Sequence, residues 1–279
     1  MSPEPANLKH VPVPVVQFTA AEREAQALAP ATLADAVKQF TATGCLHLDG
    51  AFPVELVESW RAAFLARHGD FLAAEKFEGT KPVGHRRIQL PVEFSPPFSA
   101  PSLYAHPFIL PILQALLGPR MFFGIFGSVT SLPGAEAQGL HRDNPLLFGD
   151  AINRFLPPYA INLFVPLIEF NDRTGTTRLF PGTHVRSGPE ALGHAGVDPV
   201  VRVGSCLLMD YRLYHQGTAN RSDTIRPMLF CAYHVPWFKD YVNHRAWPFL
   251  RIADADYAAI PAEHREMFAW IEHYRGGLY

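Results

Sequence analysis

The sequence predicts a mainly β protein in which a barrel or sandwich of short strands is flanked by helices. Short apolar runs alternate with clusters of Gly, Pro, Asn and Asp between residues 121 and 236, as in antiparallel strands joined by turns. Helical apolar spacing is confined mainly to the first 120 residues and to the C-terminal end. Helices do not alternate regularly with the strands, so a parallel β/α fold is not expected.

The N-terminal part contains most of the predicted helices. Residues 1–17 are rich in Pro and are expected to be extended. The apolar spacing over Ala20–Phe40 is helical, and Gly44 ends that helix. Pro53 begins a second helix, and Pro107–Leu117 forms a third.

The remaining elements are mostly short strands. Residues 79–101 are rich in Gly and Pro and are expected to form an irregular excursion or loose hairpin that covers the site. A C-terminal helical region is expected over residues 254–274. The predicted strands are Cys45–Leu48, Met121–Phe126, Ala160–Ile168, Thr177–Phe180, Ser205–Met209 and Met228–His234.

These elements fit one domain over residues 1–279. It would have a mostly helical part at 1–120, a β core at 121–238 and a helical extension at 239–279. Apolar residues make up 48% of the 279 residues, enough for a large core.

Composition also restricts the partners and the setting. Lys and Arg number 24 and Asp and Glu number 26, so binding to nucleic acid through bulk electrostatics is not expected. The three cysteines form no CxxC pair, which favours a reduced, cytoplasmic setting. No signal peptide or membrane span is expected. We expect a monomer or homodimer that acts on a small molecule.

His141 and Asp143 form a candidate metal motif. On a strand, residues i and i+2 point to the same face, so these two side chains would project together. His215 follows the apolar run Ser205–Met209, and a barrel could bring it beside them. Two histidines and one carboxylate leave other metal positions open, as in iron(II) oxygenases. Because the chain has 13 histidines, the alternative is a surface His beside a turn Asp.

Arg226 begins the next apolar run after His215, and it would lie near the mouth of the predicted pocket. A buried Arg is costly unless it meets an anion. A dicarboxylate such as 2-oxoglutarate would supply one through a bidentate contact. The alternative is a surface Arg, or one that pairs with Asp210 or Asp223.

Five segments occur in an informative order along the chain, and the last of them is the most specific. They are Phe40–Phe52, Pro133-Gly134 ahead of His141, Ala160–Leu167, Leu179–His184 and Asp210–Arg226. Together they resemble the phytanoyl-CoA dioxygenase (PhyH) family of iron(II)/2-oxoglutarate oxygenases, over roughly residues 31–238.

This resemblance implies a double-stranded β-helix core, a jelly roll of the cupin-like kind. It implies that His141, Asp143 and His215 are the catalytic residues and the iron(II) ligands. It also implies that Arg226 binds the distal carboxylate of the co-substrate 2-oxoglutarate, with O₂ as the second co-substrate.

Other co-substrate contacts are suggested by the same resemblance. Relatives place a polar residue on the strand before the first His, where this chain offers Ser128 and Thr130. Many carry a hydroxyl residue two positions after the distal His, where this chain has Gly217 followed by Thr218. Gln138 is expected to line the pocket, with a solvent-facing position as the alternative.

The implied reaction is hydroxylation of an unactivated C–H bond, with release of succinate and CO₂. Asp143 favours this outcome, because related halogenases have a small residue at the equivalent position. One alternative is a 2-oxoglutarate-independent metal enzyme on a cupin-like barrel, which would not need Arg226. The other is a non-catalytic binding member of the fold.

Substrate contacts are predicted on both sides of the metal motif. Arg86 and Arg87 lie in the excursion and could bind an anionic group, with a solvated loop as the alternative. Asn144, Arg212 and Trp237 flank the metal motifs and are expected to shape the pocket. For two further histidines, His184 is expected to be structural and His234 to belong to the core or the pocket wall.

Overall fold

The computed structural model describes residues 8–75, 77–243 and 250–275, so part of the expected extended segment 1–17 lies outside the described residues. The strands are β1 (Val15–Gln17), β2 (Cys45–Asp49), β3 (Lys81–Pro82), β4 (Arg87–Leu90), β5 (Phe122–Ser131), β6 (Ala160–Pro166), β7 (Thr177–Leu179), β8 (Cys206–Asp210), β9 (His215–Gly217) and β10 (Arg226–His234). The helices are α1 (Ala20–Ala25), α2 (Pro30–Thr43), α3 (Val54–Ala73), α4 (Pro101–Tyr104), α5 (Leu110–Leu117), α6 (Asp150–Asn153), α7 (Gly188–Leu192), α8 (Asp254–Ala258), the 3₁₀ helix η1 (Ala262–Phe268) and α9 (Trp270–Arg275).

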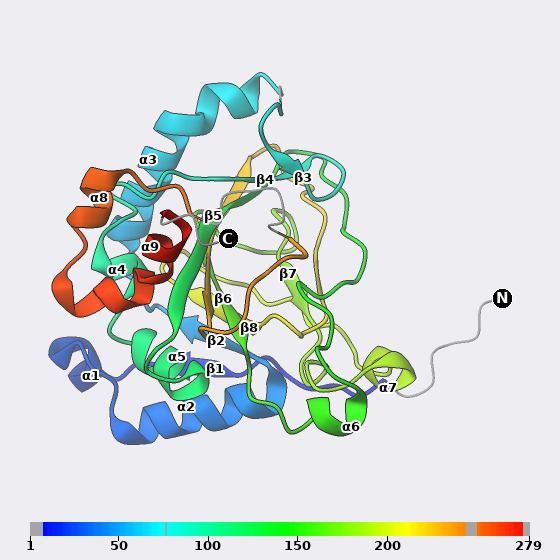
Figure 1. Cartoon of the computed structure of the whole chain (residues 1–279). Helices are drawn as coiled ribbons and strands as arrows, with labels where there is room; N and C mark the ends of the chain where they lie inside the picture. The colour runs from blue at the N-terminus through cyan, green and yellow to red at the C-terminus, as the bar shows by residue number, and fades with distance from the viewer. Residues whose placement is uncertain (1–7, 76, 244–249, 276–279) are drawn as a thin grey trace.

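Two sheets form the β core. The large sheet has the strand order β1-β2-β8-β6-β10-β5-β4-β3, and the small sheet pairs β7 with β9. The pairing of β1 with β2 is parallel, and the other strand pairs are antiparallel. Figure 1 shows α4, α8 and α9 on the side of β5 that lies away from β7. The predicted mainly β core with flanking helices is confirmed.

The central strands of the large sheet are buried on both faces, as the side chains of β10 illustrate. Leu229, Cys231 and Tyr233 pack into the cluster that includes the helices. Met228 and Phe230 belong to a second cluster on the opposite, inner face. This alternation follows from the period of two along a strand, and it decides which β10 side chains face the interior.

The predicted helix over Ala20–Phe40 is interrupted in the structure, which corrects that prediction. Gln26 adopts a left-handed conformation with φ 49° and ends α1. Pro30 then begins α2, because proline fits the first helical turn but disfavours helix in the residue before it. Gly44 ends α2 as expected, with φ 77°.

The hairpin and the long strand β5 define one side of the core. The excursion at 79–101 contains the hairpin β3–β4, and β4 pairs with β5. β5 continues to Ser131, beyond the predicted end at Phe126. Gly127 permits this, because a Cβ there would lie 2.9 Å from the carbonyl oxygen of Leu90.

No helix in the described part of the chain has the length and the apolar character that a transmembrane helix requires. Cys45, Cys206 and Cys231 are buried as free thiols.

Glu22 links α1 to α2, and its replacement tests that link. Its carboxylate accepts hydrogen bonds from Thr19 and from the backbone N–H of Ala29. Hydrogen bonds from Thr32, Thr19 and Ala29 lower the pKa of Glu22 from 4.5 to about 2. The ionised form therefore stabilises the fold fully above pH 4.5, and this stabilisation is lost as the pH falls toward 2.

We expect Glu22→Gln to lower the free energy of unfolding by about 1 kcal/mol at pH 7, as measured by urea denaturation. The difference from the unsubstituted protein should shrink below pH 4.5. Glu24→Gln, on the exposed face of the same helix, is the matched control and should have little effect. A deficit that stays constant down to pH 3 would contradict this account.

Candidate metal centre

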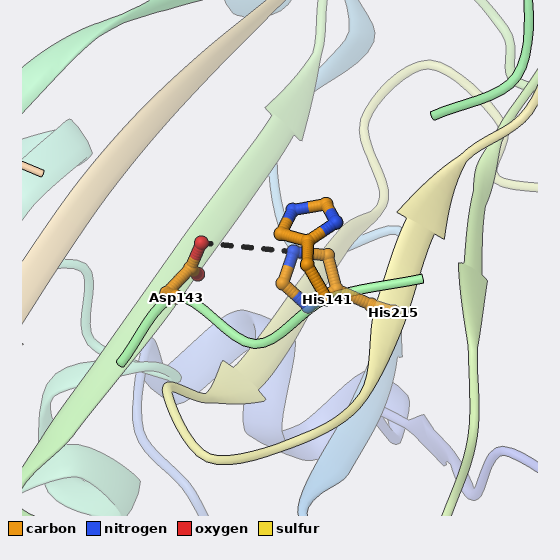
Figure 2. Close-up of side chains that lie close together, drawn as sticks. All are labelled: His141, Asp143 and His215. Atoms are coloured by element: carbon orange, nitrogen blue, oxygen red, sulfur yellow. Dashed lines mark ion pairs between the residues drawn. The ribbon is translucent and has the colours of Figure 1, made fainter. Parts of the chain in front are cut away.

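The three predicted metal ligands lie together at one point between the sheets (Figure 2). One ligand atom each from His141, Asp143 and His215 lies within 4.8 Å of the other two. The two imidazole rings have centroids 4.3 Å apart, and His215 Nε2 lies 3.7 Å from Asp143 Oδ1. The structure thus brings all three side chains to one candidate metal site.

Backbone pairing holds the two histidines together. The His141 N–H donates to the His215 carbonyl at 3.1 Å, and the His215 N–H donates to the His141 carbonyl at 2.9 Å. The segment that carries His141 thereby extends the small sheet beside β9. The N–H of Asp143 donates to the carbonyl of Tyr211 at 3.1 Å. This hydrogen bond positions the backbone of Asp143, two residues after the paired His141.

Both imidazoles are oriented in the same way. Nδ1 of His141 lies 2.8 Å from the carbonyl oxygen of Gly139, and Nδ1 of His215 lies 3.0 Å from that of Leu213. A carbonyl can only accept, so each Nδ1 carries the proton and each Nε2 keeps its lone pair. Burial lowers the pKa of His215, which favours the neutral form that a metal requires.

Two asparagines hold Asp143, one at its carboxylate and one at its backbone. Asn162 Nδ2 donates to Asp143 Oδ2 at 2.6 Å and leaves Oδ1 on the side of His215. Asn243 Nδ2 donates to the backbone carbonyl of Asp143 at 2.6 Å. These contacts fix both the side chain and the backbone of the acidic ligand.

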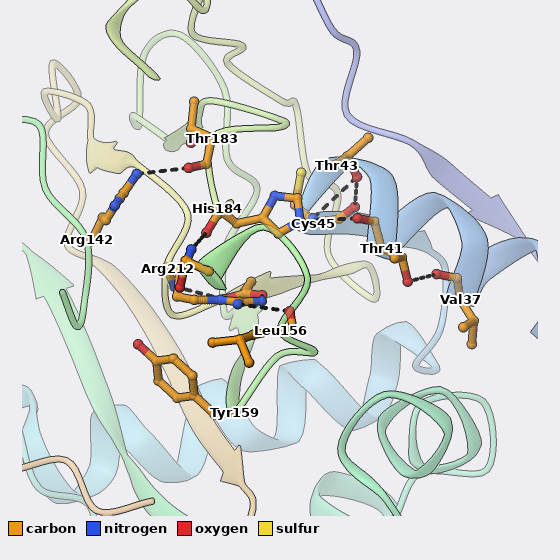
Figure 3. Close-up of polar contacts among 12 residues, drawn as sticks. Val37, Thr41, Thr43, Cys45, Arg142, Leu156, Tyr159, Thr183, His184 and Arg212 are labelled. Atoms are coloured by element: carbon orange, nitrogen blue, oxygen red, sulfur yellow. Dashed lines mark hydrogen bonds and ion pairs between the residues drawn. The ribbon is translucent and has the colours of Figure 1, made fainter. Parts of the chain in front are cut away.

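Arg142 and Thr183, whose hydrogen bond is drawn in Figure 3, connect the two segments that carry the candidate ligands. Arg142 donates to the carbonyl of Thr183 at 2.9 Å and to that of Arg186, and it stacks on the Tyr214 ring at 4.0 Å. Thr183 Oγ1 accepts the N–H of Tyr214 at 3.0 Å. One turn therefore anchors the neighbours of His141, Asp143 and His215.

The triad borders a cavity of about 530 Å³ between the sheets, called the metal cavity below. Lys81, Val83, Gly84 and Gln89 of the hairpin line one side of it. The inner face of the large sheet lines another side, with Arg226, Met228 and Phe230 of β10 among the lining residues.

Two buried arginines lie at one end of this cavity because of strand register. Ser131 on β5 is paired with Arg87 on β4 and with Arg226 on β10. Directly opposed residues point to the same face, and both guanidinium groups donate to Ser131 Oγ, at 2.7 and 2.9 Å. Arg226 lines the cavity, whereas Arg87 lies next to it.

This pair of cations lacks a matching anion. Neither arginine forms an ion pair with an acidic side chain in the described part of the chain. Nη1 of Arg87 and Nε of Arg226 are buried without a hydrogen-bond partner. Burial lowers the pKa of Arg87 to about 10 and that of Arg226 to about 9, with the Arg87 charge as a second cause for Arg226. Both stay protonated at neutral pH, so an incoming carboxylate would offset the cost of their burial.

The surroundings of Gly217 leave no room for a side chain at this position, where the family resemblance suggested a hydroxyl residue. A Cβ at Gly217 would lie 2.1 Å from Arg87 Nη1 and 2.6 Å from Gln138 Oε1. Gln138 itself lines the metal cavity and bonds to the backbone of Val83 and Gly217, at 2.6 and 2.9 Å. The guanidinium group of Arg87 and the amide of Gln138 occupy the space that a side chain at 217 would need.

Three predicted co-substrate contacts lie elsewhere. Ser128 Oγ and Thr130 Oγ1 are 2.9 Å apart, and neither residue lines the metal cavity, whereas Val129 between them does. Alternation along β5 turns both side chains away from the metal cavity, and both are fully buried on the other face of the sheet. The Thr218 hydroxyl accepts the N–H of Thr176 at 2.7 Å, and Thr218 does not line the metal cavity.

The predicted substrate residues are divided among several places. Arg86 pairs with Glu75 at 2.5 Å near the surface and does not line the metal cavity. Arg212 forms a fully buried ion pair with Asp210 at 2.7 Å. Its positive charge is therefore neutralised inside the protein by Asp210. Asn144 and Trp237 line a second cavity, which adjoins the first.

The two further histidines also have clear positions. Figure 3 shows His184 against the end of α2, where its Nε2 lies 3.2 Å from the Thr41 carbonyl. A Cβ at Gly44 would lie 2.7 Å from the His184 ring, so the two residues pack together closely. His234 lines the second cavity.

Three further residues hold the site together but were not predicted individually from the sequence: Ser131, Asn162 and Asn243. Asn162 could have been predicted as a site residue, because it is a polar residue inside the otherwise apolar run Ala160–Pro166. Ser131 and Asn243 could not, since their importance depends on partners that are distant in sequence.

The fold and the site together define a jelly-roll protein with a candidate His-Asp-His metal centre. The family model "Phytanoyl-CoA dioxygenase (PhyH)" matches residues 40–228, and the chain belongs to that family. The resemblance stated from the sequence motifs is thereby confirmed.

Curated relatives are dioxygenases by name. The chain is 33% identical over 156 residues to "Dioxygenase aneA" of Aspergillus aculeatus, which covers 50% of each chain. It is 31% identical over 123 residues to "Dioxygenase trt7" of Aspergillus terreus, which covers 42% of each. The matched region thus spans about half the length of these relatives, or less.

Solved structures share the fold at low identity. The carbocyclase SnoK from nogalamycin biosynthesis, described as non-heme and alpha ketoglutarate dependent, aligns with TM-score 0.58 and 19% identity over 81% of this chain and 94% of its own. HygX from Streptomyces hygroscopicus, solved with nickel, 2-oxoglutarate and hygromycin B bound, aligns with TM-score 0.56 and 16% identity over 80% and 96%. At these identities the likeness concerns the fold.

Asn162 offers a test of how the acidic ligand is positioned. We expect Asn162→Ala to weaken Fe(II) binding by about 10- to 100-fold, because Asp143 loses the donor that orients its carboxylate. Anaerobic titration with Fe(II) measures this. Asn171→Ala, in a turn outside the metal cavity, is the control and should leave the affinity unchanged. Equal affinities for the two variants would show that the 2.6 Å contact does not orient the ligand.

Proposed function

We propose that this protein is an iron(II)- and 2-oxoglutarate-dependent dioxygenase that hydroxylates an unactivated C–H bond of a small molecule. The observation that carries the proposal is the combination of the candidate metal triad with two buried arginines at one end of the same cavity, which have no acidic partner among the residues that the structure describes. Family membership and the dioxygenase names of the relatives support it.

The triad has the donor set that suits iron(II). His141 and His215 offer neutral Nε2 atoms, and Asp143 offers a carboxylate oxygen. Three protein ligands on a metal leave positions for a chelating co-substrate and for O₂. Bound iron(II) with 2-oxoglutarate would activate O₂, so that one oxygen atom enters the substrate and the co-products are succinate and CO₂.

The arginine pair has the charge that suits the distal carboxylate of 2-oxoglutarate. We assign the direct contact to Arg226, which lines the cavity. Arg87 adds a second positive charge and shares Ser131 with it. The sequence hypothesis assigned Arg87 to an anionic substrate, whereas its position beside Arg226 supports the proposal that it helps to bind the co-substrate.

This arrangement also bears on the two alternatives. An enzyme that needs no 2-oxoglutarate would have no use for two uncompensated cations beside its metal. A non-catalytic binding member would not need both imidazoles with free Nε2 atoms. The cytoplasmic setting and the monomeric or dimeric state stay predictions.

Loss of either imidazole should abolish the metal centre. Anaerobic addition of Fe(II) and 2-oxoglutarate to the unsubstituted protein should produce the weak visible charge-transfer band of the chelate. We expect His141→Ala and His215→Ala to lose this band and to bind Fe(II) at least 100-fold more weakly, whereas the exposed His85→Ala should keep both. An unchanged band in the two triad variants would reject the assigned ligands.

Replacing the arginines should weaken co-substrate binding in a graded way. We expect Arg226→Met to raise the Kd of 2-oxoglutarate by roughly 10- to 100-fold, as for loss of a charged hydrogen bond of about 1.5–3 kcal/mol. Arg87→Met should have a smaller effect, because Arg87 acts mainly through its charge. Calorimetry on the metal-loaded protein measures both.

The matched control is Arg178→Met, which removes an exposed arginine paired with Asp198 at 2.6 Å. It should leave the Kd unchanged. Normal turnover by Arg226→Met without any greater need for 2-oxoglutarate would instead favour the co-substrate-independent enzyme.

A further inference from the structure

A second cavity of about 630 Å³ adjoins the metal cavity on the side away from Arg226. Along β10, Arg226, Met228 and Phe230 line the metal cavity, whereas His234 at the far end lines the second one. Strand β10 therefore runs from the end of the metal cavity near Arg226 to the wall of the second cavity.

Two side chains form the boundary between the cavities. Tyr211 and Asp240 line both of them. The metal-ligand segment also reaches both, since Asp143 borders the metal cavity and the next residue, Asn144, borders the second. A molecule that fills the second cavity would thus lie directly beside the candidate metal centre.

The lining of the second cavity is mainly aromatic and apolar. Its aromatic side chains are Phe122, Tyr211, Trp237, Phe238, Tyr241 and Trp270. Its volume lies within the range of cavities that hold drug-sized ligands, about 300–1,000 Å³. Such walls bind flat or bulky apolar groups through burial of large surfaces.

The charges on this lining do not favour an anion. Among the described residues, the charged ones in this lining are Lys239 and Asp240, one of each sign. The Lys239 ammonium lies 4.9 Å from the centroid of the Tyr241 ring. Asp240 accepts hydrogen bonds from the backbone N–H groups of Val242 and Asn243, at 3.1 and 2.9 Å, so its carboxylate is engaged by its own segment.

The rim of the cavity is exposed and apolar. Trp237, Tyr241 and Val242 are 69%, 62% and 60% exposed, and Leu147 lies in the same lining. Single exposed apolar residues are ordinary, whereas a group of them marks an interaction surface. Here the group surrounds a cavity, which favours a small-molecule ligand.

The segment that carries this rim is fastened to the metal site. Asn243 bonds to the carbonyl of Asp143 and, at 3.2 Å, to Asp240 Oδ2. Lys81 of the hairpin donates to the carbonyl of Asn243 at 3.0 Å. Asn243 therefore connects the wall of the second cavity to the acidic metal ligand Asp143 and to the hairpin.

We propose that the second cavity holds the bulk of an uncharged, predominantly apolar substrate of drug-like size. The reacting carbon of that substrate would reach the metal cavity past Tyr211 and Asp240. This inference rests on the proposed function and specifies the substrate class of the same site. It replaces the expectation of an anionic substrate, because Arg86 is paired with Glu75 and Arg87 adjoins Arg226.

Two dyes with one ring system test the charge preference. N-phenyl-1-naphthylamine is uncharged, and 8-anilinonaphthalene-1-sulfonate adds a sulfonate to the same rings. Fluorescence titrations would use the full chain loaded with metal and 2-oxoglutarate without O₂. We expect the uncharged dye to bind at least tenfold more tightly than the sulfonate. Equal or tighter binding of the sulfonate would overturn the proposal.

Variants at the rim test the location. Trp237→Ala combined with Tyr241→Ala should weaken binding of the uncharged dye at least fivefold, and both residues are exposed enough to be replaced without loss of the fold. Phe155→Ala is the control, because Phe155 is 81% exposed and lines neither cavity. An equal loss of affinity in the control, or no loss in the double variant, would overturn the proposal.

The dye experiments can be distinguished from a failure of the proposed function. The rim variants should keep the Fe(II)/2-oxoglutarate charge-transfer band, since they touch neither the triad nor the arginines. If the unsubstituted protein lacks that band but binds the uncharged dye at this rim, the proposed reaction fails and the apolar binding site stands.

Discussion

The reciprocal backbone pairing of His141 with His215 is the interaction on which the rest of the site depends. Two hydrogen bonds, at 3.1 and 2.9 Å, bring together segments that lie far apart in the sequence. Each imidazole then donates its Nδ1 proton to a carbonyl two residues earlier and presents Nε2 to the same point. Asp143 completes the group because the Tyr211 carbonyl holds its backbone.

Around this pairing the interior is divided by charge along β10. At one end Arg226 lies beside Arg87 without an acidic partner among the described residues. At the other end the aromatic lining of the second cavity surrounds His234. The proposed anionic co-substrate and uncharged substrate would therefore bind on opposite sides of the metal. The buried arginines attract a carboxylate, whereas the aromatic walls favour an apolar surface.

Local patterns predicted the elements well where one physical signal dominated. The strand Ala160–Ile168 and the helix ending at Gly44 agree closely with β6 and α2, because apolar runs and a left-handed glycine are properties of neighbouring residues. The break between α1 and α2 was missed although Pro30 signals it. The end of β5 was misplaced because its continuation depends on pairing with β4 and β10.

The sequence by itself determined the fold class, the triad His141, Asp143 and His215 as candidates, and Arg226 as a candidate anion site. These depend on periodicity, on spacing and on the family resemblance. Only the tertiary structure decided that Arg87 joins Arg226 while the adjacent Arg86 faces Glu75. The physical reason is strand register: Ser131 on β5 stands opposite both buried arginines, and a pairing between distant strands cannot be read from neighbouring residues.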